Sequence, residues 1–102
     1  MQIKTVKTGS GFNVNIKDVI KTIEDSGNFK KELTDLVNSN PKADIEVHVI
    51  DSYIITSSII GTLMKLIQKD GAKISLHTYN ADLYELMDKL NLVQLLNVKK
   101  HF

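Results

Sequence analysis

The chain has 102 residues, a length that suits one domain built around one hydrophobic core. It contains no cysteine, which excludes a disulfide framework and a cysteine-based metal site. Its net charge is only +1 and every basic residue is a lysine, which argues against a dedicated nucleic-acid-binding protein. No apolar run approaches the ~20 residues that span a bilayer and no signal peptide is recognisable, so we expect a cytoplasmic protein without membrane insertion.

The first elements in chain order are two strands. In residues 2–7 apolar residues stand among polar ones, and residues 12–16 alternate strictly between apolar and polar, which is typical of half-buried strands. The Gly-Ser-Gly sequence at 9–11 reads as a turn between them. The chain is therefore expected to begin with a hairpin.

A helix is expected next, although residues 17–25 fit either its beginning or an extension of the second strand. Ser26 or Asn28 is the expected N-cap, and the sequence from Asn38 to Pro41 ends the helix. Its apolar residues recur at helical spacing, at Phe29, Leu33, Leu36 and Val37.

The second half alternates strands and helices. We expect a strand at 45–50, a short extended piece at 53–55, an amphipathic helix from about residue 57, and a strand at 73–77. Asn80 then caps a third helix. A short final strand ends near Phe102. The apolar stripes of these two helices are Ile59, Ile60, Leu63, Met64 and Ile67, and Leu83, Leu86, Met87 and Leu90.

This order predicts an α/β fold with a mixed, largely parallel sheet of about four to five strands and right-handed crossovers. A sheet covered on both faces needs nearly continuous apolar strands. The strand at 45–50 instead alternates, with Glu46 and His48 between apolar residues. The helices are therefore expected mainly on one face, which leaves the other face polar.

His48 and His77 are expected on that polar face. A two-histidine metal site is one interpretation of the pair. We favour solvated surface histidines, because no third ligand stands at a recognisable spacing from them. The five glycines form no phosphate-binding loop, and no catalytic triad can be nominated. The sequence therefore predicts neither an enzyme nor a cofactor.

Three hydroxyl residues, Thr56, Ser57 and Ser58, stand where the second helix begins. A helix N-terminus favours negative charge, because its N–H groups are free and its dipole is positive there. One hydroxyl is enough to cap a helix, so two are left over. A phosphoryl group on one of them would add a charge of about −1.5 to −2. We expect such a charge to affect partner binding more than folding.

The second half of the chain resembles the STAS domain, the fold of bacterial anti-sigma factor antagonists. The family has Asp-Ser-Ser-Gly-Leu-Gly before an amphipathic helix, where this chain reads Thr-Ser-Ser-Ile-Ile-Gly at 56–61. The downstream match covers Asp-Gly-Ala-Lys-Ile-Ser-Leu at 70–76 and the Leu-rich segment 83–92. The resemblance extends over about 29–102, and more loosely over the N-terminal strands. It implies one STAS-like domain over 1–102.

By this resemblance, Ser57 matches the serine that a partner kinase phosphorylates in these antagonists. Thr56 is a rival acceptor, since related single-domain regulators use a threonine. The implied partners are an ATP-using serine kinase, which is also the anti-sigma factor, and an opposing phosphatase. Phosphorylation would block binding and thereby control transcription by partner switching. The expected partner-binding residues are Tyr53, Ile54, Thr56, Ser57, Ser58, Ile59 and Ile60.

The chain departs from the family motif at two positions. Thr56 replaces the usual aspartate, and Ile59 replaces the usual glycine. These departures also fit a second hypothesis, a STAS subunit that is not phosphorylated and docks on the ATPase of an ABC-type lipid-transport complex. Binding of a small ligand such as a nucleotide or lipid is a third possibility, which no particular residue supports.

Overall fold

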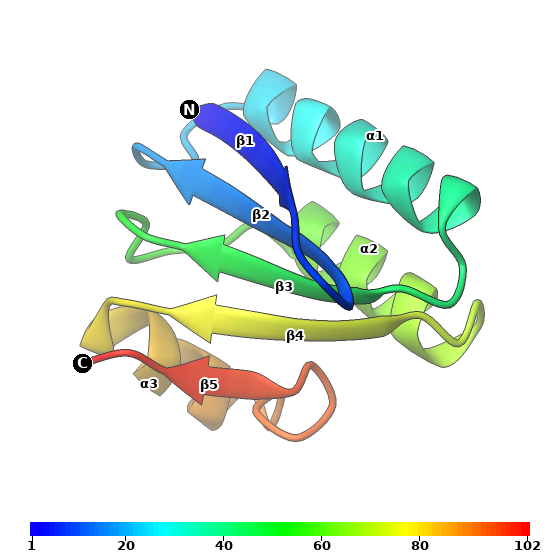
Figure 1. The fold of residues 1–102 in the computed structure, drawn as a ribbon. Coiled ribbons are helices and arrows are strands. Elements are labelled where there is room, and N and C mark those ends of the chain that lie inside the picture. The colour runs from blue at the N-terminus through cyan, green and yellow to red at the C-terminus, as the bar shows by residue number, and fades with distance from the viewer.

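The sheet has five strands that lie in the order in which the chain forms them. The computed structural model describes residues 1–102, and Figure 1 shows the strands side by side. β1 runs antiparallel to β2, and every later neighbour is parallel, as the sequence predicted. The strands are β1 (Gln2–Lys7), β2 (Gly11–Lys17), β3 (Asp44–Val49), β4 (Lys73–Thr78) and β5 (Val98–Lys100).

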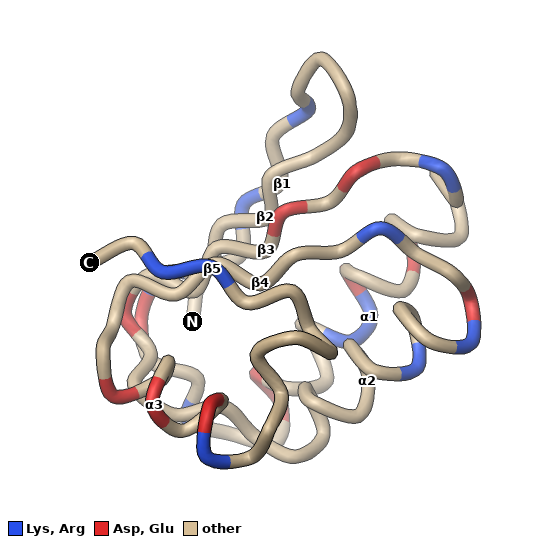
Figure 2. Tube along the Cα trace, turned by 90° about the horizontal axis from the view of Figure 1, so that it is seen from below, with Lys and Arg blue, Asp and Glu red and all other residues tan.

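Three helices connect the parallel strands: α1 (Ile23–Ser39), α2 (Ser57–Gln68) and α3 (Ala81–Lys89). Figure 2, in which the sheet is seen from its edge, shows all three on the same side of the sheet. The predicted one-sided arrangement is therefore confirmed. None of the helices combines the length and the apolar character that a membrane-spanning helix requires.

The core lies between the helices and the covered face of the sheet. It is one cluster of 21 buried apolar residues. The alternation of β3 continues into the structure, with Ile45, Val47 and Val49 buried against the helices. The same period places Ile74 and Leu76 of β4 in the core. The opposite face, which carries the intervening polar residues, has no helix over it.

The start of α1 differs from the sequence prediction. The N-cap is Thr22, whose hydroxyl accepts a hydrogen bond from the N–H of Asp25 at 2.9 Å. Asp25 in return accepts from the N–H of Lys21 at 3.0 Å and of Thr22 at 3.3 Å, which completes a capping box. The bond from Lys21 is the main cause that holds the pKa of Asp25 below its ordinary value. Ser26, one of the predicted caps, instead lies buried within the helix.

The extended piece predicted at 53–55 does not join the sheet. β3 already has β2 on one side and β4 on the other, so no free strand edge is available beside it. Residues 50–56 form a loop instead, with Ile55 buried. The predicted end of the first helix between Asn38 and Pro41, and the predicted Asn80 cap of α3, agree with the structure.

We expect Gly11→Ala to lower the free energy of unfolding by about 1–3 kcal/mol or more, as overpacking does. A Cβ at Gly11 would collide with the backbone of Asp44, its partner in the β2–β3 register. Gly27→Ala is the matched control, because that exposed position within α1 has open space around it. It should stabilise the protein by about 0.5–1 kcal/mol. Urea denaturation measures both, and equal effects would contradict the close approach of β2 and β3.

Candidate functional site

The first turn of α2 holds the three hydroxyls that the sequence singled out, and they are not equivalent. Thr56 is the N-cap, and its hydroxyl accepts from the N–H of Ile59 at 3.3 Å. The same hydroxyl is hydrogen-bonded at 2.9 Å to that of Ser26 in α1. Thr56 therefore stabilises the start of α2 and ties it to the neighbouring helix.

Ser57 and Ser58 are exposed, and the side chain of neither makes a hydrogen bond. Only the backbone carbonyl of Ser58 is used, as the acceptor for the hydroxyl of Thr62 at 2.9 Å. Thr56 occupies the N-cap position of α2, so neither serine caps the helix. Ser57 and Ser58 are thus the two hydroxyls with no structural task.

A shallow groove between α1 and α2 adjoins these serines. Lys30 from α1 and Lys65 from α2 line it together with Ser57 and Ser58. Two lysines and the positive end of the α2 dipole therefore lie around the exposed hydroxyls. The surroundings favour a negatively charged group over a positive one.

The predicted partner-binding residues divide into exposed and buried ones. Tyr53 and Ile54 are 55% and 48% exposed in the loop before α2. Ile60 is partly buried against the core. Ile59 is fully buried, so the prediction that its side chain contacts a partner is wrong for this conformation. Its side chain anchors α2 to the core and cannot reach a partner in this conformation.

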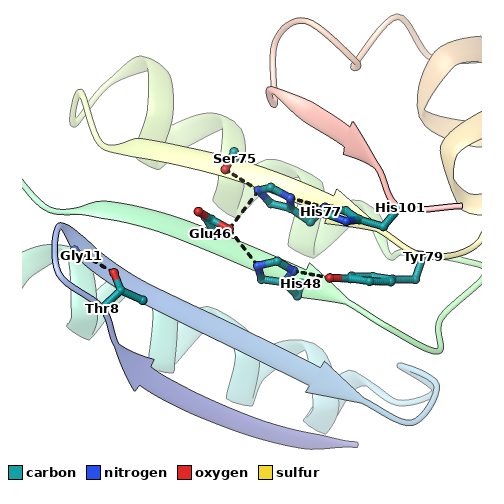
Figure 3. Close-up of polar contacts among 8 residues, drawn as sticks. All are labelled: Thr8, Gly11, Glu46, His48, Ser75, His77, Tyr79 and His101. Atoms are coloured by element: carbon teal, nitrogen blue, oxygen red, sulfur yellow. Dashed lines mark hydrogen bonds and ion pairs between the residues drawn. The ribbon is translucent and has the colours of Figure 1, made fainter.

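A second cluster of polar side chains lies on the bare face of the sheet, where three imidazoles meet (Figure 3). His48 of β3 and His77 of β4 are partners in the strand register, and their rings stack with centroids 4.4 Å apart. His101, which follows β5, brings its Nε2 to 2.7 Å from Nδ1 of His77. The hydroxyl of Tyr79 lies 2.8 Å from Nδ1 of His48 and completes the group.

Glu46 and Ser75 contact the opposite sides of the same rings. Oε1 of Glu46 is 3.0 Å from Nε2 of His48 and 3.6 Å from Nε2 of His77. The hydroxyl of Ser75 is 2.8 Å from Nε2 of His77. Burial lowers the pKa of His77, as does the neighbouring imidazole of His48, while the carboxylate of Glu46 acts in the opposite direction. The neutral imidazole is thereby favoured.

The expectation of two solvated histidines is wrong in two respects. His48 is only 8% exposed, and a third histidine joins the pair. Residue spacing did not reveal His101 because it lies 24 residues beyond His77, after the end of another strand. The period of two could have found it once the register of β5 was known, since Lys99 is the partner of His77 and His101 follows on the same face.

Comparisons with known proteins extend only to the fold. No family model matches the chain, and no curated protein matches it. Among solved structures, the chain is similar to the NMR structure of the protein TM1081, with a TM-score of 0.74 and 17% sequence identity. The match covers 98% of this chain and 82% of that one. At this identity the likeness shows a shared fold.

Substitutions should separate the structural hydroxyl from the free ones. Thr56→Ala removes the cap of α2 and the partner of Ser26, and should lower the free energy of unfolding by about 1–2 kcal/mol. Ser57→Ala and Ser58→Ala should each stay within about 0.5 kcal/mol of wild type. Urea denaturation distinguishes these outcomes, and a large loss with Ser57→Ala would show that Ser57 has a structural role.

The stability of the protein should fall as the pH drops below about 6.5, the ordinary pKa of histidine. Folding lowers the pKa of His77, so the unfolded chain binds a proton more readily than the folded chain between the ordinary and the lowered pKa. The groups facing His77 are His48, Glu46, His101 and Lys99. Urea denaturation in EDTA at pH 7.5 and 5.5 measures the effect. His77→Gln should reduce the dependence of the free energy of unfolding on pH. An unchanged dependence in this variant would show that His77 is not its cause.

Proposed function

We propose that the protein is a cytoplasmic protein-binding module of the STAS type, resembling an anti-sigma factor antagonist, whose partner binding is controlled by phosphorylation of Ser57. The observation that carries the proposal is the exposed, unbonded hydroxyl of Ser57 in the first turn of α2. Beside it in the chain, the loop exposes Tyr53 and Ile54 as apolar contacts. In this role the chain binds proteins and is not an enzyme.

Ser57 is the better acceptor of the two candidates. A kinase must reach the hydroxyl and accommodate it in its own active site. The Thr56 hydroxyl is partly buried and hydrogen-bonded both to Ser26 and to the N–H of Ile59. A phosphoryl group on Thr56 would remove its O–H as a donor and crowd both contacts, whereas a phosphoryl group on Ser57 disturbs no side-chain hydrogen bond. Thr56 is therefore kept only as the second candidate.

The phosphoryl group would act on binding through charge and desolvation. Within the domain, its charge of about −1.5 to −2 is compatible with the α2 N-terminus and with Lys30 and Lys65. A partner that packs on Tyr53 and Ile54 would have to bury that charge, which is costly without a cationic group opposite it. The modified protein would then release its partner without losing its fold.

The partner class comes from the resemblance. It is an ATP-using serine kinase that also acts as an anti-sigma factor, with a phosphatase that restores the free serine. The ATP belongs to the kinase. Switching between these partners would regulate transcription.

A second candidate function is constitutive docking on the ATPase of an ABC-type lipid-transport complex. The structural roles of Thr56 and Ile59 favour it. Both residues depart from the family motif, and here one serves as a cap and the other as a core anchor. A chain that keeps the docking surface but no longer needs the kinase reaction could use these positions for folding.

The first test is mass mapping of the protein isolated from its cells, with replacement variants alongside. We expect phosphate on Ser57, lost in Ser57→Ala and kept in Ser58→Ala, the matched exposed control. Thr56→Asn removes the rival hydroxyl while retaining a good helix cap. Modification at residue 57 should persist in that variant. If no residue of this loop is ever phosphorylated, the proposed control of partner binding by phosphorylation is wrong.

The second test identifies the partner by pull-down with wild type and Ser57→Glu. Recovery of a serine-kinase ATPase by wild type, reduced at least tenfold with Ser57→Glu, supports the switch. Recovery of an ABC-type ATPase by both proteins supports constitutive docking instead. Tyr53→Ala with Ile54→Ser should weaken either complex, because both exposed side chains are removed from the docking loop.

A further inference from the structure

We propose that the bare face of the sheet carries a binding site for one zinc-type transition-metal ion, with His48, His77 and His101 as its ligands. One ligand nitrogen from each imidazole lies within 4.8 Å of the others. Figure 3 shows Nδ1 of His77 directed at His101, on the side of the ring away from Glu46. We assign the ligand atoms as Nδ1 of His48, Nδ1 of His77 and Nε2 of His101.

The spacing of the nitrogens suits a tetrahedral ion. Zinc binds imidazole nitrogen at about 2.0–2.1 Å, which places two nitrogen ligands about 3.3 Å apart. The separation of 2.7 Å between His77 and His101 and the upper limit of 4.8 Å for the set lie on either side of this value. The rings of His48 and His77 stack with their centroids 4.4 Å apart, so they would have to tilt toward each other when the ion binds.

The far side of the rings already has the partners that metal-binding histidines require. Such a histidine almost always donates its other N–H to a carboxylate or another acceptor, which fixes its tautomer and orientation. Here Nε2 of His48 is 3.0 Å from Oε1 of Glu46. Nε2 of His77 is 2.8 Å from the hydroxyl of Ser75 and 3.6 Å from the same carboxylate. Nδ1 of each ring would bind the ion, and Nδ1 of His48 would give up its hydrogen bond to the hydroxyl of Tyr79.

The charges near the site favour a cation moderately. Glu46 supplies a negative charge beside two of the ligands, and Lys99 supplies an opposing positive charge near His77. Three neutral nitrogens select a borderline metal such as zinc over calcium or magnesium, which prefer oxygen. Three protein ligands would leave one tetrahedral position for water.

The ion would also have a mechanical effect on the chain. β5 has only three residues, and His101 lies beyond its end. A metal bond from His101 to β3 and β4 would fasten this terminal segment to the middle of the sheet. Binding should therefore order residues 98–102 and raise the melting temperature.

Titration of the untagged, EDTA-treated protein with zinc chloride tests the proposal, followed by calorimetry and thermal unfolding. We expect one ion per chain and a higher melting temperature. Co²⁺ should give the strong visible absorption of a tetrahedral site. No binding, or the weak spectrum of an octahedral ion, would overturn the assignment.

His101→Gln is the decisive variant, because His101 is exposed and its loss should leave the fold intact in EDTA. It should weaken zinc binding more than tenfold, and Glu46→Gln should weaken it about 10–100-fold through the ring orientation. Lys99→Met should strengthen binding. Asn13→Ala, on the same face of β2, is the control and should change nothing. Zinc affinity unaffected by His101→Gln would refute the site, whatever the outcome at Ser57.

Discussion

Each crossover connection moves the chain one strand further in the same direction, from β2 to β3 to β4 to β5. A right-handed crossover then always places its helix on the same side of the sheet. One face of the sheet is buried by α1, α2 and α3, and the other is left bare (Figure 2). The core, the polar face and both candidate sites depend on this constraint.

The parallel direction of the strands explains why the two sites lie at one edge. The carboxyl ends of β3, β4 and β5 meet there, and ligands of open α/β sheets bind beyond such ends. The loop after β3 leads to Ser57 on the helix side. His48, His77 and His101 lie at or beyond the same strand ends, with their rings on the bare side. A partner and an ion could therefore occupy the protein together.

Much of the fold could be predicted from local patterns in the sequence. The strand alternation, the element order and the Asn80 cap are each encoded within a few residues, so they could be read directly. The rest depends on contacts between distant segments. The bond from Thr56 to Ser26 spans 30 residues and that from His77 to His101 spans 24. Neither follows without helix packing and the β5 register, and the Thr22 cap was missed because Ser26 and Asn28 are also good capping residues.

The alternation of β3 and β4 has a consequence for how this protein can change. Ile45, Val47 and Val49 build the fold, while Glu46 and His48 between them build surface chemistry. The residues that form the core and the residues that form the polar surface therefore alternate along the same strand. A histidine on the bare face can be gained or lost with little effect on the core. Ligands on the bare face can therefore be exchanged by substitution while the apolar positions that build the core keep their residues.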